Sequence, residues 1–295
     1  MALGSWQLRR ELRRAERSLP GDATMQEAFD SLQALSLDDF AAFLWSMPDS
    51  DHPRLSRALP PMAPAETQER WTGASGARLL SQSVDFARLM MDFAEQQTGR
   101  PLGGARVLDY GCGYGRFARL LTHRVRVADY YGVDPWQPSI DACRAAGLGD
   151  NVQLSSYLPD SLPVESGTFD LTFAFSVFTH LSERATTCAL PLLVDSLKPD
   201  GALVITIRPT TYWDVDQRTA GTSLAGEMKA QHSETGFAFL PQRGPTVDGD
   251  ITYGDTSMSL QWLVSRVPHA EIVSTRVAIS DPHQLCVMMR RRTSA

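Results

Sequence analysis

The sequence has few cysteines and no long hydrophobic runs. Its four cysteines are widely scattered among 295 residues and form no Cys-x-x-Cys pair, at positions Cys112, Cys143, Cys188 and Cys286. A disulfide framework is therefore not expected, and no His, Cys or carboxylate cluster has the spacing of metal ligands. No apolar run reaches the ~20 residues that cross a bilayer, and the first residues lack the apolar stretch of a signal peptide. These absences predict a reduced, metal-independent, cytoplasmic protein without a transmembrane segment.

An excess of positive charge is also missing. The chain has 28 Lys and Arg residues against 34 Asp and Glu residues, a net charge of −6. This balance argues against a nucleic-acid partner, whose binding proteins usually present a basic surface. Hydrophobic residues make up 43% of the chain, enough for one substantial core and an appendage.

Two short apolar runs that each end in an acid are the most informative feature. The run 107–110 contains Asp109 and leads into a Gly-x-Gly-x-Gly loop, and the run 130–134 ends in Asp134. Glycines let the backbone turn sharply after a strand and approach a ligand closely. An acid at the end of the next strand can accept both hydroxyls of a ribose. The pattern therefore predicts a nucleoside pocket.

The loop spacing separates two kinds of nucleoside ligand. Dinucleotide-binding loops carry Gly-x-Gly-x-x-Gly and seat a pyrophosphate, which Asp109 would repel. An acid there suits a cationic ligand, and the loop resembles the first motif of class I S-adenosylmethionine-dependent methyltransferases. The segments 169–181 and 197–207, with a turn expected at 197–201, resemble the fourth and fifth strands of that family. The resemblance covers about residues 76–292.

The resemblance implies an α/β fold with a doubly wound, mostly parallel seven-stranded sheet. Near-continuous apolar strands alternate with helical segments from residue 107 to 207, as in parallel sheets covered on both faces. A helix at 259–267 and two strands at 271–279 and 284–290 complete the pattern. We expect a methyltransferase domain over residues 76–295, beginning with a helix at 76–97, and a separate helical extension over residues 1–75.

The helical extension begins with a basic segment. Residues 6–19 carry five arginines against two glutamates, and residues 25–47 follow a helical period before a proline-rich connection. The basic segment could contact a membrane surface, a partner protein or a second copy in a homodimer. The alternative is an ordinary solvated helix face.

A long interruption follows the expected fifth strand. Residues 209–255 span ~45 positions where connections usually take ~2–6, and they mix aromatic with polar groups. Ligands of open α/β sheets bind at the carboxyl ends of strands, so we interpret this insertion as a cap over the acceptor. A dimerisation arm is the alternative.

The resemblance also implies roles for individual residues. Asp109, Gly111, Gly113 and Gly115 would surround the methionine part and ribose edge of S-adenosylmethionine, and Asp134 would bind the ribose hydroxyls. Adenine would lie against Pro135 and Trp136, although Trp136 also suits core packing. The usual acid after the third strand is missing, which leaves Ser156 or Tyr157 as substitutes. Ser176 would lie beside the sulfonium, and Trp71 and Thr72 belong either to a lid or to a plain linker.

The base is predicted less directly. His180 follows Ser176 by four positions, on the same helix face if a helix has begun there, and an imidazole can take a proton at neutral pH. A cap or packing role is the alternative for His180. The competitors as base are His232, Glu234 and Asp255 in or beside the insertion.

The sequence thus predicts methyl transfer to a small molecule or a sugar or other glycan, with oxygen preferred over nitrogen as the acceptor atom. An N-methyltransferase and a catalytically silent scaffold for a partner enzyme remain alternatives. A nicotinamide-dependent oxidoreductase is opposed by Asp109 and by the glycine spacing.

Overall fold

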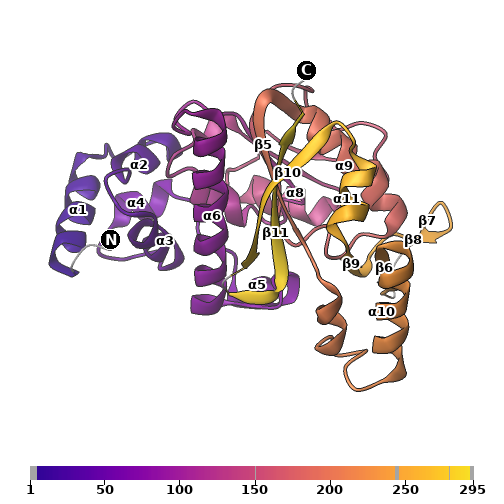
Figure 1. The fold of residues 1–295 in the computed structure, drawn as a ribbon. Coiled ribbons are helices and arrows are strands. Elements are labelled where there is room, and N and C mark those ends of the chain that lie inside the picture. Colours follow the sequence, from indigo (N-terminus) through magenta and orange to yellow (C-terminus); the bar gives the residue numbers. More distant parts are fainter. Residues whose placement is uncertain (1–4, 150, 243–245, 279, 293–295) are drawn as a thin grey trace. The chain divides into compact units, whose positions relative to one another are not determined.

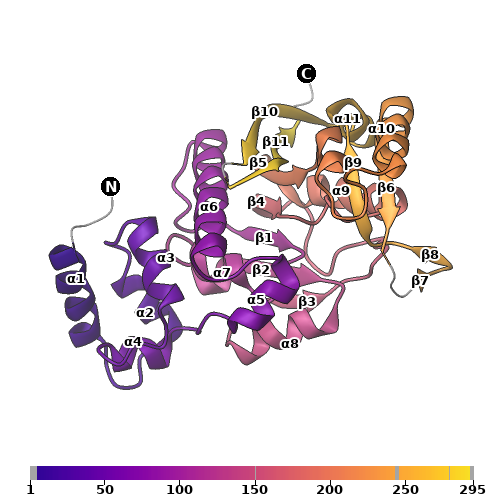
Figure 2. The same cartoon turned by 90° about the horizontal axis from the view of Figure 1, so that it is seen from below.

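A computed structural model describes residues 5–149, 151–242, 246–278 and 280–292. Figure 1 labels β5, β10 and β11 of its main sheet, which has seven strands in the order β10-β11-β5-β4-β1-β2-β3 (Figure 2). The pairs β1–β2 and β4–β5 are parallel, whereas β11 runs antiparallel to both β5 and β10. The predicted mixed α/β fold with a mostly parallel seven-stranded sheet is confirmed. The chain divides into two compact units, Met1–Asp92 with Arg100–Gln153, and Phe93–Gly99 with Leu154–Ala295.

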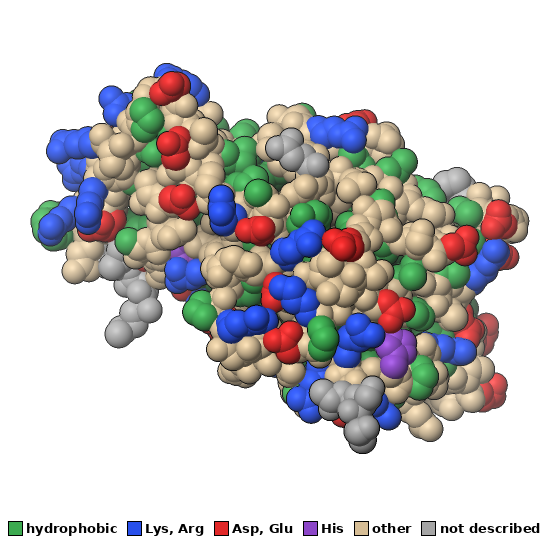
Figure 3. Space-filling model, turned by 90° about the horizontal axis from the view of Figure 1, so that it is seen from above, with side chains coloured by type: hydrophobic (Ala, Val, Ile, Leu, Met, Phe, Trp, Pro, Cys, Tyr) green, Lys and Arg blue, Asp and Glu red, His purple; other side chains and the backbone are tan. Residues whose placement is uncertain are grey.

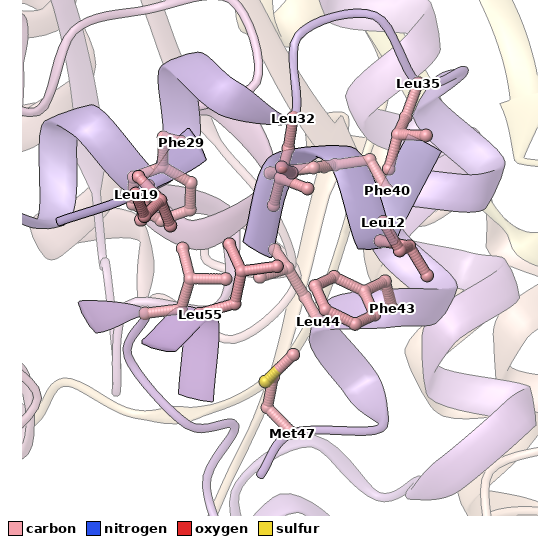
Figure 4. Close-up of a cluster of buried hydrophobic side chains, with 13 residues drawn as sticks. Leu12, Leu19, Phe29, Leu32, Leu35, Phe40, Phe43, Leu44, Met47 and Leu55 are labelled. Atoms are coloured by element: carbon pink, nitrogen blue, oxygen red, sulfur yellow. The ribbon is translucent and has the colours of Figure 1, made fainter. Parts of the chain in front are cut away.

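The first unit begins with four helices that share a buried core, part of which Figure 4 shows. Leu12, Ala15 and Leu19 contribute to this core at helical spacing, together with Phe29 and Phe40. The helices are α1 (Ser5–Ser18), α2 (Met25–Ser31), α3 (Leu37–Trp45) and α4 (Pro53–Ala58).

The helical segment expected over residues 25–47 is two helices. Helix α2 ends at a cap on Leu32, and the Ser36 side chain accepts the backbone N–H of Asp39 to begin α3. A serine in this position satisfies an N–H group that has no partner inside the helix, so a new helix begins there. The proline-rich connection also contains α4, where Pro53 occupies the first turn and the missing N–H costs nothing.

The remainder of the first unit surrounds the glycine loop. Tyr130 to Asp134 lie beside Val107 to Tyr110 in parallel register. The elements are α5 (Ala65–Thr72), α6 (Gly76–Thr98, which continues into the second unit), β1 (Val107–Tyr110), α7 (Arg116–Leu121), η1 (Val127–Asp129), β2 (Tyr130–Asp134), α8 (Gln137–Ala145) and β3 (Val152–Leu154).

The second unit contains the antiparallel edge of the sheet. Its elements are β4 (Phe169–Ala174), α9 (Glu183–Ser196), β5 (Leu197–Ile207), α11 (Leu260–Arg266), β10 (Ala270–Ala278) and β11 (Asp281–Arg291). The turn expected at 197–201 lies inside β5 instead. Leu197 pairs with Phe169, and pairing resumes at Ala202 with Leu171, so residues 198–201 form an irregularity in the strand. A Cβ on Gly201 would lie 2.8 Å from the Phe169 carbonyl oxygen, which explains the glycine.

The insertion after β5 folds around a small core of its own. Trp213, Ala225 and Ala238 are buried together in this segment. The insertion comprises η2 (Thr210–Asp214), α10 (Ser223–Thr235), β6 (Phe237–Pro241), β7 (Thr246–Val247), β8 (Asp250–Ile251) and β9 (Gly254–Met258). Strands β6 and β9 pair antiparallel, and β9 continues three residues beyond the expected end at Asp255. Among the described helices, none combines the length and the apolar character that crossing a bilayer requires.

Candidate active site

The glycine loop follows β1 and leads into α7 (Figure 2). Gly111, Gly113 and Gly115 have φ angles of 78°, 55° and 74°, in the left-handed region that side chains disfavour. A Cβ on Gly115 would lie 2.9 Å from Leu148 Cδ1, whereas one on Gly113 would meet nothing within 4 Å. Gly115 is therefore required by packing and conformation together. Gly113 leaves open space beside the backbone, as a loop that admits a ligand needs.

Asp134 holds the loop from the end of β2. Its Oδ2 accepts the backbone N–H of Gly113 at 3.0 Å, and its Oδ1 accepts the N–H of Trp136 at 2.9 Å. Burial raises the pKa of Asp134, and these hydrogen bonds oppose that effect. The carboxylate therefore fixes two backbone segments at the place where the ribose-binding acid is predicted.

The Asp109 side chain is more deeply buried than the predicted contact with the methionine part of the ligand would require. The side chain is 2% exposed and accepts the Tyr130 hydroxyl at 2.7 Å. Burial raises the pKa of Asp109 to about 7, although the Tyr130 hydrogen bond and the charge of Arg116 act in the opposite direction. The acid therefore has a defined protein partner across β1 and β2.

Three aromatic side chains gather beside the loop. The ring of Trp71 lies 4.7 Å from that of Trp136 and 5.8 Å from that of Tyr114. Trp71 Nε1 and the Tyr114 hydroxyl are buried without a hydrogen-bond partner among the described residues. Buried polar atoms normally have partners, so both atoms fit a site that a polar ligand completes. Trp136 is 44% exposed, so it does not serve as core packing.

The residues beside these aromatic rings differ in whether their hydrogen-bond donors are already used within the protein. Thr72 donates its hydroxyl to the carbonyls of Gln68 and Ala74 at 2.8 and 2.9 Å, beside the left-handed cap residue Gly73 that ends α5. Pro135 is half-buried between β2 and α8. Trp71 thus has a free donor, whereas the hydroxyl proton of Thr72 is already used by the backbone.

A buried arginine supports the loop from α7. The Arg119 guanidinium is 2% exposed and donates to the carbonyls of Tyr114 and Gly115 at 2.6 and 2.8 Å. It also donates to the carbonyl of Pro61 at 2.9 and 3.2 Å. One side chain therefore fixes the glycine loop and the proline-rich connection together.

In the second unit, Ser176 follows β4 in a strained conformation. Its φ is 59°, which is uncommon for a residue with a side chain. The backbone N–H donates to Thr206 Oγ1 at 2.7 Å, and the hydroxyl lies 3.3 Å from Thr179 Oγ1. Strained residues cluster at functional sites, which agrees with a site role for Ser176. Tyr157 is 38% exposed after β3.

His180 lies in the turn before α9. The helix expected to have begun there begins at Glu183 instead, because Ser182 accepts the N–H of Ala185 as its cap, so the helix-face argument for His180 was wrong. His180 Nδ1 lies 2.8 Å from the Gly254 carbonyl oxygen, which can only accept, so Nδ1 carries the proton. Burial, followed by the positive charge of Arg208, lowers the pKa of His180 to about 4. The imidazole is neutral at pH 7, with an unprotonated Nε2.

A buried carboxylate organises the groups around His180. Asp255 is 4% exposed and forms ion pairs with Arg208 and Arg218. It also accepts the Tyr212 hydroxyl at 3.0 Å and the Gln242 amide at 3.1 Å. Burial alone would raise the pKa of Asp255, but the charge of Arg208, the hydrogen bond from Gln242 and the proximity of His180 lower it. Asp255 is therefore an anion whose oxygens are fully engaged.

The insertion is attached to the His180 turn by backbone hydrogen bonds. Gly254 N–H donates to the His180 carbonyl at 2.8 Å, and Thr256 N–H donates to the Thr179 carbonyl at 2.9 Å. The Tyr253 ring stacks on His180 at 5.1 Å. His232 is separate in its contacts, because its Nδ1 lies 2.9 Å from Ser257 Oγ, which also accepts from Trp213 at 2.7 Å. The structure thus joins His180 with Asp255, and gives His232 a place in the packing of α10 on β9.

Sequence reasoning missed Tyr114 and Arg208. Tyr114 stands inside the glycine motif, and a large polar ring between two glycines was the available signal. Arg208 directly follows the apolar run of β5, and its Nη2 lies 3.5 Å from His180 Nε2. A charged residue at the carboxyl end of a parallel strand is a signal for a ligand site.

Comparison with known proteins adds to this geometry. Residues 107–201 match the family model described as "Methyltransferase domain". Ribosomal protein L11 methyltransferase from Ralstonia pickettii is 32% identical over 118 residues, which cover 40% of this chain and 36% of that protein. Ubiquinone biosynthesis O-methyltransferase from Sinorhizobium fredii is 31% identical over 100 residues, which cover 32% of this chain and 40% of that protein. The chain thus spans less than half the length of these curated relatives.

A structural comparison gives a weaker likeness. An S-adenosylmethionine-dependent methyltransferase from Mesorhizobium loti aligns with a TM-score of 0.45 and 17% identity, over 67% of this chain and 98% of that one.

Proposed function

Since this chain contains a class I methyltransferase domain of the S-adenosylmethionine-dependent kind, we propose that it transfers the methyl group of that cofactor to an oxygen atom of a small molecule or a sugar. The observation that carries the choice of oxygen is His180. Its imidazole is neutral, its tautomer is fixed by the Gly254 carbonyl, and its Nε2 is unprotonated. A hydroxyl acceptor needs such a group, whereas an amine needs it less.

The cofactor-holding role belongs to the loop after β1 and its neighbours. Asp134 accepts the ribose hydroxyls, and the open side of Gly113 receives the methionine part. Trp71 and Trp136 flank the adenine, and the free Trp71 Nε1 and Tyr114 hydroxyl supply hydrogen bonds. S-Adenosylmethionine, when bound, supplies an electrophilic methyl group on a positively charged sulfur.

The acceptor side is proposed to work through three residues. His180 Nε2 takes the proton of the acceptor hydroxyl, so the O–H electron pair stays on the acceptor oxygen. The cofactor would supply the methyl group to that oxygen, and the electron pair of the broken carbon–sulfur bond would remain on sulfur. The Arg208 guanidinium, which donates to Nε2 at 3.5 Å while no acceptor is bound, turns this donor to the acceptor oxygen and stabilises the negative charge that develops there. Asp255 positions Arg208 and is not itself the base, because four donors compete for its two oxygens.

The insertion is proposed to be the acceptor cap. It supplies Asp255 to the His180 cluster and the Gly254 carbonyl that fixes the imidazole. Tyr253 adds an aromatic face that is 52% exposed beside the same ring. A dimerisation arm would not need these contacts with His180.

The test begins with calorimetric titration of the protein with S-adenosylhomocysteine and, in parallel, with NADH. Methyl transfer from labelled S-adenosylmethionine is then measured with acceptor pairs that differ only in a hydroxyl or an amine. His180→Ala should lower turnover on the hydroxyl acceptor by roughly 10²–10⁴-fold, with S-adenosylhomocysteine affinity unchanged. His269→Ala, at a partly exposed position outside the cluster, is the control.

The outcomes separate the alternatives. Binding of S-adenosylhomocysteine with turnover on hydroxyl acceptors supports the proposal. Turnover on the amine members alone, insensitive to His180→Ala, makes the protein an N-methyltransferase. Failure to bind S-adenosylhomocysteine would leave the scaffold alternative, and binding of NADH alone would overturn the cofactor.

A further inference from the structure

Helix α1 presents one face made almost entirely of arginine. At about 100° per residue, Trp6, Arg9, Arg10, Arg13, Arg14 and Arg17 fall within an arc of about 140°, and all six are exposed. The opposite side carries Leu12, Ala15 and Leu19, which are buried in the core of the N-terminal helices. In Figure 3, blue side chains gather at the left of the view, over the N-terminal helices. We call this arc the arginine face.

The positive charges of the arginine face are largely uncompensated. Among the described residues, its one ion pair joins Arg14 to Glu11 at 3.8 Å, and the Arg14 side chain is 81% exposed. Glu16, the other acid of α1, does not face the arginines. Its carboxylate accepts the backbone N–H groups of Arg54 and Leu55 at 2.9 and 3.0 Å and caps α4. The Glu16 carboxylate is therefore engaged by the first turn of α4.

We propose that the arginine face docks on the surface of an anionic lipid bilayer. Guanidinium groups pair with phosphate oxygens in bidentate fashion, and basic segments are attracted to anionic leaflets. The proposal is independent of the methyl-transfer chemistry.

The distribution of charge favours a planar partner over nucleic acid. Helix α1 carries a net +3 in a chain of net −6, so the rest of the chain carries −9. A bilayer contacts only the arginine face. Acids on the far side of the helix, which is ~10 Å thick, lie beyond the Debye length of ~8 Å at physiological salt, so their repulsion of the bilayer is screened. A nucleic acid long enough to engage more of the protein would meet the excess of acids.

Trp6 favours a lipid surface over an acidic protein. Its ring is 66% exposed, lies within the arginine face, and is 5.7 Å from the Arg10 guanidinium carbon. Arg10, Arg13, Arg14, Arg17 and Ser18 line a surface hollow together with this ring. Tryptophan prefers the headgroup level of bilayers, where one edge is apolar and the other is wet. The apolar side of α1 stays in the protein core, so docking is at the surface and needs no unfolding.

The experiment is co-sedimentation of the full chain with vesicles of phosphatidylcholine alone and with 30% phosphatidylglycerol, at about 0.1 M salt. The test variant is R10Q/R13Q/R14Q. The matched control is R78Q/R126Q/R276Q, which removes three exposed arginines outside the arginine face. Circular dichroism melting and S-adenosylhomocysteine titration check that both variants are folded.

Each arginine at an anionic surface contributes about fivefold in affinity, so the test variant should bind the anionic vesicles about 100-fold more weakly. The control should bind like the wild type, and neither should bind phosphatidylcholine alone. Absent binding of the wild type to anionic vesicles, or equal losses in both triple variants, would overturn the proposal. Tighter binding to a DNA duplex or to polyglutamate at the same salt would assign the arginine face to that partner instead.

Discussion

Acid should destabilise this protein through one histidine that has no part in the proposed chemistry. The His123 ring is fully buried, stacks on Phe40 at 4.6 Å, and donates Nε2–H to the Leu35 carbonyl at 2.9 Å. Burial, followed by the charge of Arg124, lowers the pKa of His123 to about 4 from an ordinary value of 6.5. The folded protein therefore holds a neutral imidazole where α3 meets α7.

The sign and size of the effect follow from linkage. The pKa of His123 in the folded state lies below its value in the unfolded state. The stabilisation is therefore complete above about pH 6.5 and is lost as the pH falls towards 4, because over that range the unfolded chain binds a proton at His123 and the folded chain does not. One pKa unit corresponds to about 1.4 kcal/mol. A pKa of about 4 for His123 therefore implies a loss of about 2 kcal/mol at pH 5 and about 3 kcal/mol at the acid limit.

The assay is urea unfolding at pH 7.5 and pH 5.0 for the wild type and for His123→Gln. Glutamine retains an N–H donor for the Leu35 carbonyl but does not titrate, so the variant should lose about 2 kcal/mol less between the two pH values. The control His269→Gln leaves the His123 site untouched and should keep the full contribution. An identical pH dependence in the wild type and His123→Gln would refute the reasoning.

Three substitutions test other parts of the molecule. Gly115→Ala should cost about 1–3 kcal/mol in urea unfolding, because φ is 74° and the new Cβ would lie 2.9 Å from Leu148; an unchanged midpoint would contradict this packing. Asp134→Asn should weaken S-adenosylhomocysteine binding at least tenfold by calorimetry, because the amide has one accepting oxygen where the carboxylate has two; equal affinity would remove Asp134 from the site. Asp255→Asn should cost about 3 kcal/mol, since Arg208 and Arg218 lose their counter-charge, and unfolding free energies that match the wild type would mean that solvent already screens the pair.

The sequence predicted features that rest on short local signals. The strands around the glycine loop are apolar runs with an acid at their ends, and the sharp turn expected at Gly111, Gly113 and Gly115 is made with positive φ angles. The break between α2 and α3 also has a local signal, because Ser36 precedes Asp39 by three residues. The continuous apolar period over residues 25–47 nevertheless predicted a single helical segment.

Other features depend on partners far apart in the chain. Arg208 and Asp255 are 47 positions apart, and neither residue alone predicts a buried ion pair. The tautomer of His180 is set by the carbonyl of Gly254, 74 positions away. The irregularity in β5 follows from its pairing with β4, since residues 198–201 read locally as a turn. Such details arise from tertiary packing, which periodicity and spacing do not encode.

Arg119 has a thermodynamic consequence for the N-terminal helices. Because one guanidinium holds the carbonyls of Tyr114 and Gly115 and that of Pro61, the conformations of the loop and of the proline-rich connection share a single set of hydrogen bonds. A ligand at the loop and a partner that holds the connection would therefore change each other's affinity by the same factor, wherever one of them alters this set of hydrogen bonds.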